Sequence, residues 1–220
     1  MAKVILVRHG QASFGAQDYD RLSDTGKRQA ALTRSVLPAG ARVVCGTMRR
    51  HQQTAHRATP DAPPELDPDW NEFDYLDVIR ARRPDLGTQA ALIGSMHREA
   101  DPKRAFQTLY AQAMDRWACG DHDHDYAESR PAFCARVARA FRQLSETSDR
   151  PTVVVTSGGP IAAVTQSILS LSEPITRQIE FTLANASLTT FSVSSRSPRL
   201  ISLNSFTHLE APHHDLVTYR

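Results

Sequence analysis

The residues best suited to chemistry lie near the amino terminus, where Arg8 and His9 directly follow the apolar run 4–7. A run of this kind predicts a short buried strand, so the two side chains would stand at its carboxyl end. In open α/β sheets, ligands bind at that edge. A neutral imidazole beside a guanidinium suits attack on a phosphoryl group, because the guanidinium holds the oxyanions and the imidazole supplies the lone pair. Gly10 comes next and would permit a sharp exit from the strand.

The elements that must position these residues alternate between strands and helices. Apolar, β-branched runs predict strands at residues 3–7, 42–46 and 151–156, and the last of these is a candidate central parallel strand. A late hairpin is predicted at residues 187–193 and 199–205, joined by a turn rich in serine, arginine and proline. The predicted helices run from Ser23 or Asp24 to about Val36, from near Arg49, and over residues 101–118, 131–145 and 158–169. This order favours a three-layer α/β/α sandwich with a mostly parallel central sheet and the hairpin at its edge.

Residues 60–130 have a different pattern. A proline-rich, acidic connection is followed by helices, and we find no strand pattern in this block. The apolar stripe of the helix at 101–118, with Phe106, Tyr110 and Trp117, is interpreted as core packing. We therefore predict a single domain of residues 1–220 with a helical cap inserted at about 60–130.

Composition limits the classes of function. Apolar residues make up 40% of the 220 residues, which is enough for a core, and the net charge of +2 argues against a general nucleic-acid binder. The spacing of the three cysteines (Cys45, Cys119 and Cys134) fits neither a zinc site nor a disulfide framework. We therefore expect no metal and a reduced, cytoplasmic setting. The amino-terminal apolar run is too short for a signal peptide or a membrane span.

Several segments, taken in order, resemble one known family. Arg8-His9-Gly10 resembles the RHG signature of the histidine phosphatase superfamily, the phosphoglycerate-mutase-like proteins. In the first half of the chain, residues 22–26 with Gln29 and Ala30 resemble the family segment "LT..G..QA", residues 50–55 resemble "RA.QTA", and residues 71–73 resemble the segment that carries the family's acid. In the second half, residues 127–129 resemble "GES", residues 153–159 resemble "VVVSHGG", and residues 185–188 resemble "N.S". The resemblance spans about residues 3–206 and implies the same three-layer fold.

The resemblance implies a role for each matched residue. His9 would be the nucleophile and form a phosphohistidine, since the neighbouring arginines disfavour imidazolium and keep the ring neutral. Arg8 and Arg50 would clamp the phosphoryl group through bidentate hydrogen bonds. Glu72 would be the general acid that protonates the leaving alkoxide, and Asp74 is the alternative.

One position departs from the family pattern. The resemblance implies a second histidine at position 157, which donates a hydrogen bond to the phosphoryl oxygens, but this chain has Ser157. The serine hydroxyl can also donate, and the amides of Gly158 and Gly159 remain available to an anion at the helix start. Another histidine could take the vacant role, with His97 and His208 as candidates. Gln11 and Ser13 could contact phosphate or serve as ordinary loop residues.

Three functions fit these residues. The first is a metal-independent phosphomonoester hydrolase without a cofactor, acting on a small phosphorylated substrate. The second is a weak or inactive pseudo-phosphatase that binds a phosphorylated ligand, as Ser157 suggests. The third, ranked lowest, is a phosphoglycerate-type mutase. We expect no nucleic-acid or membrane partner, and either a monomer or a homodimer paired through the strand near residue 200.

Overall fold

The computed structural model describes residues 2–13, 19–147, 149–193, 197–210 and 214–219. The chain divides into two compact units. The first, which we call the sheet unit, comprises Met1–Glu72 and Arg136–Arg220. The second, which we call the helical unit, comprises Phe73–Ala135.

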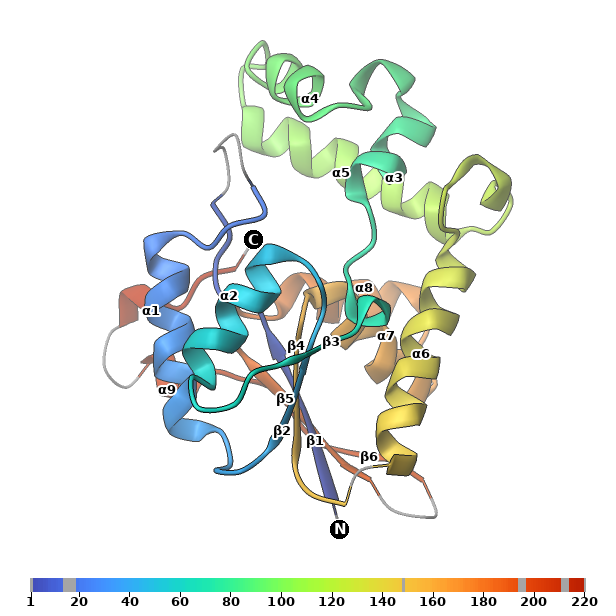
Figure 1. Ribbon diagram of the computed structural model, residues 1–220. Coiled ribbons are helices and arrows are strands. Elements are labelled where there is room, and N and C mark those ends of the chain that lie inside the picture. Colours follow the sequence, from blue (N-terminus) through green and yellow to red (C-terminus); the bar gives the residue numbers. More distant parts are fainter. Residues whose placement is uncertain (1, 14–18, 148, 194–196, 211–213, 220) are drawn as a thin grey trace. The chain divides into compact units, whose positions relative to one another are not determined.

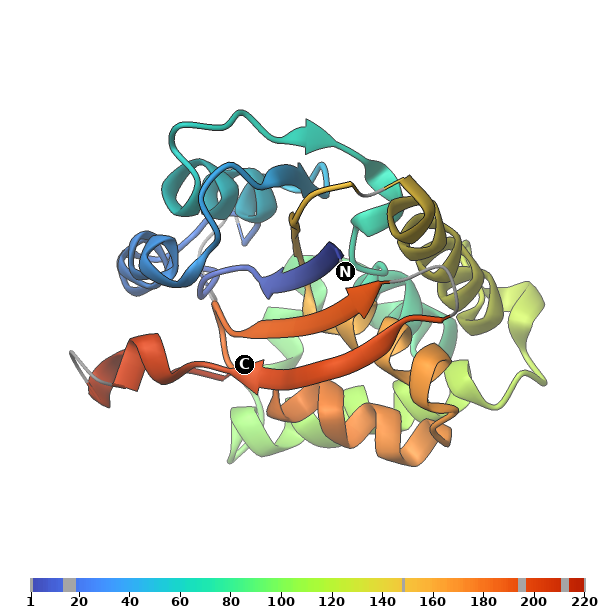
Figure 2. The same cartoon turned by 90° about the horizontal axis from the view of Figure 1, so that it is seen from below.

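A six-stranded sheet organises the sheet unit, in the order β3-β2-β4-β1-β5-β6. Its strands are β1 (Ala2–Arg8), β2 (Arg42–Cys45), β3 (Glu65–Leu66), β4 (Thr152–Thr156), β5 (Leu188–Val193) and β6 (Arg199–Ser205). Neighbours from β3 to β1 are parallel, whereas β5 and β6 are antiparallel and lie at the edge beside β1 (Figure 2). The predicted α/β class, the mostly parallel sheet and the edge hairpin are confirmed. Residues 194–196 of the predicted hairpin turn lie outside the described part.

Both faces of the sheet are covered, which explains why β1 and β4 are continuous apolar runs. On one face, Ile5, Val7 and Val155 form a cluster with Ala55 of the helix that follows β2. On the other face, Phe191 of β5 packs edge-on against Phe141, with ring centroids 5.3 Å apart. The central strands are therefore buried from both sides, as the three-layer arrangement requires.

The helices of the sheet unit follow the strands in the expected order (Figure 1). They are α1 (Asp24–Thr33), α2 (Arg49–Ala58), the greater part of α6 (Arg130–Thr147), α7 (Gly158–Leu169), α8 (Glu173–Thr182) and α9 (Thr207–Glu210), with short 3₁₀ turns at Arg34–Val36, Pro68–Trp70 and His214–Leu216. Ser23 caps α1 by accepting a hydrogen bond from the Gly26 amide at 3.0 Å, as predicted. The helix α8 was not predicted from the sequence. No helix in the described part is both long and apolar enough to cross a membrane.

The helical unit contains α3 (Tyr75–Arg82), α4 (Gln89–Met96), α5 (Pro102–Ala118) and the first turns of α6, with 3₁₀ turns at Pro84–Leu86 and Asp123–Asp125. Trp117 of α5 is fully buried at its centre, with ring centroids 4.7 Å from Phe73 and 5.7 Å from Phe133. The expectation that residues 60–130 contain no strand is wrong, because β3 pairs with β2. Its two exposed residues are too few to show a strand periodicity.

Gly10 and Gly26 let the loop after β1 lie directly against the first turn of α1. A Cβ atom on Gly10 would stand 2.3 Å from the carbonyl oxygen of Gly26, and one on Gly26 would stand 2.1 Å from that of Gln11. The positive-φ glycines in the described part are Gly40 and Gly120, so Gly10 does not use the left-handed region. The loop requires the missing side chain rather than the conformational freedom of glycine.

A Gly26→Ala substitution should therefore destabilise the protein by about 1–3 kcal/mol, because the new methyl group meets backbone atoms that cannot move aside. Gly94→Ala is the matched control. It lies in α4 with nothing within 4 Å of the new Cβ, so it should be neutral or stabilise by about 0.5–1 kcal/mol. Urea unfolding of both variants measures the difference, and equal losses of stability would contradict the close packing.

Candidate active site

The carboxyl ends of three adjacent parallel strands place the first site residues together. The amide of His9 donates to the carbonyl of Thr156 at 2.8 Å, and the amide of Gly46 donates to that of Val155 at 3.1 Å. Since Ser157 directly follows Thr156, residues 9, 46 and 157 leave β1, β2 and β4 at the same edge of the sheet. This is the edge at which α/β proteins bind ligands.

His9 is held in one orientation and one tautomer. Its Nδ1 lies 2.7 Å from the carbonyl oxygen of Gly10, which can only accept, so Nδ1 carries the proton. The Nε–H group of Arg50 donates to Nε2 at 3.2 Å, which assigns the lone pair to Nε2. The amide of Ala186 fixes the backbone by donating to the His9 carbonyl at 3.2 Å. The imidazole therefore presents a nucleophilic nitrogen toward a guanidinium.

The surroundings of His9 keep the ring neutral. The side chain is buried, and burial is the largest cause that lowers its pKa well below the ordinary value of 6.5. The charge of Arg50, then His51, then Arg8 act in the same direction, and the hydrogen bond to Gly10 opposes them with a smaller effect. At neutral pH, His9 is thus an uncharged base, which is the form that can attack phosphorus.

Arg50 is positioned by Asp20, which the sequence analysis did not predict. The Nη1 of Arg50 lies 2.7 Å from Oδ1 of Asp20, and the Arg50 side chain is 8% exposed. The other oxygen of the same carboxylate accepts from the amide of Arg49 at 2.8 Å, at the amino-terminal end of α2. A carboxylate is favourable there, because the helix dipole places partial positive charge at that end. Asp20 therefore anchors both the guanidinium and the helix that carries it.

Arg8, the second predicted clamp arginine, directly precedes His9 in the chain and is also buried. Its Nη1 donates to the carbonyl oxygen of Leu183, between α8 and β5. Its Nε stands 3.8 Å from the place of a Cβ atom on Gly158, the first residue of α7. The two predicted clamp arginines thus enter the site from different elements, and Gly158 lies beside one of them.

Glu72 reaches the amino-terminal end of α7. Its Oε2 accepts a hydrogen bond from the amide of Gly159 at 3.1 Å, so this amide, which we expected to be available to an anion, is bonded to the predicted acid. Asp74, the alternative acid, belongs to the helical unit and caps α3, accepting from the amides of Leu76 at 2.9 Å and Asp77 at 3.3 Å. Of the two carboxylates, Glu72 is the one that is hydrogen-bonded to the start of α7.

Gln11 and Ser13 have structural contacts in the loop after His9. The Gln11 Oε1 accepts from the hydroxyl of Ser23 at 2.7 Å, and the Gln11 amide donates to Gln29 at 2.8 Å. The Ser13 amide donates to the carbonyl of Arg21 at 2.7 Å. These bonds connect the loop to the start of α1, as expected of ordinary loop residues.

Ser157 meets a histidine that the sequence analysis did not consider. The Nε2 of His51, in the first turn of α2, lies 2.7 Å from the Ser157 hydroxyl oxygen. The rings of His51 and His9 have centroids 5.6 Å apart. Burial, followed by the charge of Arg50, lowers the pKa of His51 well below 6.5. The available signal was that His51 stands where the "RA.QTA" pattern has alanine.

His97 and His208, the two candidates to replace the second family histidine, have their described contacts outside the site. His208, in α9, has its Nε2 3.4 Å from the hydroxyl of Thr33, at the end of α1. His97 is the C-cap of α4 in the helical unit. Neither has a hydrogen bond with a residue of the site among the described contacts, so the prediction missed the histidine that does.

The stability of the protein should depend on pH, because His9 and His51 are neutral in the folded state. Unfolded histidines bind protons as the pH falls below about 6.5, whereas folded His9 and His51 do not, so the unfolded state binds more protons. The free energy of unfolding should therefore decrease from pH 7 to pH 5, by up to about 1.4 kcal/mol per pH unit for each histidine. Urea unfolding at several pH values measures this slope. The His51→Leu variant should have a shallower slope, and an unchanged slope would contradict the neutral state of His51.

The fold is similar to that of several solved structures. A phosphoserine phosphatase variant from Entamoeba histolytica, crystallised with phosphoserine, aligns with a TM-score of 0.68 and 19% identity over 95% of this chain and 100% of its own. A mycobacterial glucosyl-3-phosphoglycerate phosphatase in complex with VO3 aligns with a TM-score of 0.63 and 23% identity over 93% and 100%. No curated protein sequence matches the chain.

The sequence also matches a family profile. The profile of the histidine phosphatase superfamily (branch 1) aligns with residues 4–102 and 93–205. These segments include both predicted clamp arginines, His9, Glu72 and the turn after β4. The chain belongs to the histidine phosphatase superfamily.

Proposed function

We propose that the protein is a metal-independent phosphomonoester hydrolase that acts through a phosphohistidine on His9. The observation that carries the proposal is the arrangement of His9 itself. Its Nδ1 hydrogen is bonded to the Gly10 carbonyl, and its Nε2 lone pair faces the Nε–H of Arg50. Membership of the superfamily and the phosphatases among the structural neighbours support the same class of reaction.

The first step is the attack of His9 on phosphorus. A bound phosphoryl oxygen would take over the Nε–H of Arg50, which frees the Nε2 lone pair to form the N–P bond. The bond between phosphorus and the ester oxygen breaks, and its electron pair leaves with that oxygen. The ring gains positive charge while keeping its Nδ1 hydrogen, and the Gly10 carbonyl stabilises this charge through the existing hydrogen bond.

Glu72 would donate a proton in the first step and accept one in the second. As a carboxylic acid, it would give its proton to the leaving oxygen and become a carboxylate. The carboxylate would then take a proton from water as the water oxygen attacks the phosphohistidine. The N–P bond breaks, inorganic phosphate leaves, and His9 returns to its neutral form. The hydrogen bond to Gly159 holds Glu72 at the start of α7.

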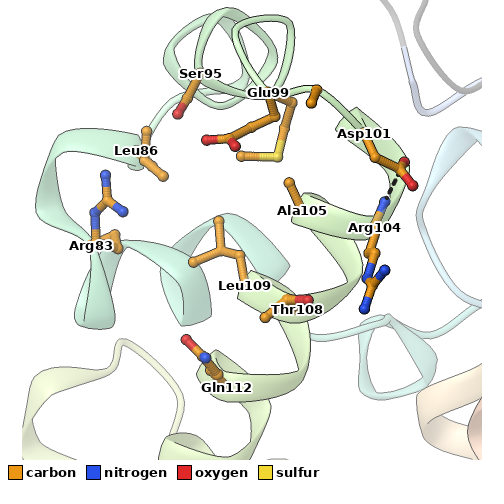
Figure 3. A pocket seen from close by; sticks show the side chains of 12 residues that line it. Arg83, Leu86, Ser95, Glu99, Asp101, Arg104, Ala105, Thr108, Leu109 and Gln112 are labelled. Atoms are coloured by element: carbon orange, nitrogen blue, oxygen red, sulfur yellow. Dashed lines mark hydrogen bonds between the residues drawn. The ribbon is translucent and has the colours of Figure 1, made fainter.

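Two arginines of the helical unit already have carboxylate partners, because Arg80 is paired with Asp77, and Arg83 with Asp85. An open cavity of about 460 Å³ lies near α4 and α5, with Arg83, Glu99 and Arg104 among its lining residues (Figure 3). Its mixed charge indicates no single ligand class. We therefore propose a small phosphorylated substrate without naming the group that carries the phosphate.

The pseudo-phosphatase remains the second candidate, and the observation in its favour is the serine at position 157. It predicts that inorganic phosphate raises the unfolding temperature while no ester is hydrolysed. We rank the phosphoglycerate-type mutase lowest. The cytoplasmic setting, the absence of nucleic-acid and membrane partners, and the choice between monomer and homodimer stay predictions.

Substitution of His9 tests the nucleophile. We expect the wild type to hydrolyse p-nitrophenyl phosphate in the presence of a chelator, and His9→Ala to fall to the buffer background, because the attacking lone pair is gone. His56→Ala is the matched control, since His56 lies exposed on α2, and it should retain full turnover. A His9→Ala variant with wild-type activity would exclude the phosphohistidine route, and inhibition by the chelator would exclude metal independence.

Substitution of Glu72 tests the proton donor. In Glu72→Gln, the first turnover of an alkyl phosphate should slow by about 10²–10⁴-fold, since the alkoxide needs a proton to leave. The first turnover of p-nitrophenyl phosphate should slow far less, because p-nitrophenolate leaves without one. Rapid-mixing measurement of both substrates separates these cases. Equal slowing would argue against a general acid, and Asp74→Asn serves as the control that should change neither rate.

A further inference from the structure

His51 has an environment that suggests more than core packing. Its side chain is completely buried in the first turn of α2. A Cβ atom on Gly46 would stand 2.3 Å from its Nδ1, so the ring occupies the space left by that glycine. In this position, Nε2 lies 2.7 Å from the Ser157 hydroxyl. The ring is therefore fitted to its cavity with one nitrogen directed at the position where the family pattern has histidine.

The hydrogen bonding of the ring indicates its tautomer. The Nδ1 of His51 is buried and has no hydrogen-bond partner in the described part of the chain. If Nδ1 carried the proton, a buried donor would be left without an acceptor, which is costly. If Nε2 carries the proton, the ring donates to the Ser157 oxygen, and Nδ1 is left as an acceptor without a donor. We take a buried unpaired acceptor to cost less free energy than a buried unpaired N–H donor. We therefore assign the proton to Nε2.

This tautomer determines what the Ser157 hydroxyl can do. Its oxygen accepts the hydrogen bond from His51, so its own hydrogen points to another acceptor. The described residues offer it no acceptor in the protein. Ser157 directly follows Thr156, whose carbonyl bonds to the amide of His9, and directly precedes Gly158 beside Arg8. An oxygen of a phosphoryl group held by Arg8 and His9 is the acceptor that the site lacks.

We propose that Ser157 and His51 act as one donor unit to the transferring phosphoryl oxygens, with Ser157 as the contact and His51 as its positioning residue. The inference rests on the proposed function. Relative to the family patterns, the small residue and the histidine have exchanged places, since alanine is expected at position 51 and histidine at position 157. The two departures occur at side chains that touch, so the lost imidazole is restored from α2 rather than from the turn after β4.

Kinetics of paired variants test the unit. His51→Leu and Ser157→Ala should each lower kcat on p-nitrophenyl phosphate by about 10²-fold, with a far smaller change in KM, because the bond matters most in the transition state. The double variant should lose no more than either single one, since both remove the same donor. His51→Gln keeps an N–H donor and should retain more activity than His51→Leu, which fills a similar volume without one.

An exchange variant provides the positive control. His51→Ala combined with Ser157→His restores the family pattern and should recover most of the kcat lost in His51→Ala. Each variant is compared with the wild type by thermal unfolding, so that a folding defect is recognised. The inference would be overturned if the losses of kcat in the double variant were additive. It would also be overturned if His51→Gln and His51→Leu both kept wild-type activity. Either result would leave the phosphatase function intact.

Binding of orthovanadate separates this inference from the proposed function. Vanadate can take the five-coordinate geometry of phosphoryl transfer, and its dissociation constant can be measured whether or not the protein turns over. We expect His51→Leu and Ser157→Ala to weaken its binding at least 10-fold, whereas His56→Ala should bind it as the wild type does. If the wild type hydrolyses no ester but these losses appear, the phosphatase proposal fails, and the donor unit stands as a contact to a bound phosphoryl-like anion. Unchanged vanadate binding in both variants would overturn the donor unit.

Discussion

The parallel pairing of β1 with β4 is the constraint on which the site depends. The pairing places the residue after Arg8 beside Thr156 and Ser157 before any side-chain contact is made. A shift of one residue in this register would turn His9 and Ser157 to opposite faces of the sheet. Both faces of these strands are buried, so such a shift would break the close packing of their side chains against the layers on either side. The chemistry of the site is thus set by the same burial that stabilises the sheet.

A second constraint is the charge that the site must hold. Two buried guanidinium groups would be costly without partners, and the structure gives Arg50 the carboxylate of Asp20 and gives Arg8 the carbonyl of Leu183. Burial of His9, followed by the charges of Arg50, His51 and Arg8, lowers its pKa, so the imidazole is neutral. In the reaction that we propose, guanidinium groups held in place before the substrate binds would stabilise the charge of the transferring phosphoryl group.

The sequence predicts those parts of the molecule whose signals are local. Continuous β-branched runs marked β1, β2 and β4, and Ser23 marked the start of α1. The strand β3 was missed because it has two residues. The helix α8 was missed because polar residues, Thr176 and Glu180, form its buried side, whereas the apolar Ile175 and Phe181 are exposed. Asp20 and His51 were missed for another reason. Their roles arise from contacts between segments that are distant in sequence, such as the 106 positions between His51 and Ser157, and no spacing rule encodes such a contact.

The hydrogen bond between His51 and Ser157 also has a mechanical consequence. The first turn of α2 carries Arg50 and His51, and Asp20 fixes that turn. The first turn of α7 carries Gly159, which holds Glu72. The bond between His51 and Ser157 connects these two turns across the strand ends, so a side-chain contact links the turn that carries Arg50 to the turn that holds Glu72. When an imidazole sits at position 157, the donor moves with α7. In the donor unit that we propose, the imidazole is carried by α2 next to Arg50, so the first turns of α2 and α7 would have to keep their relative position for Ser157 to donate.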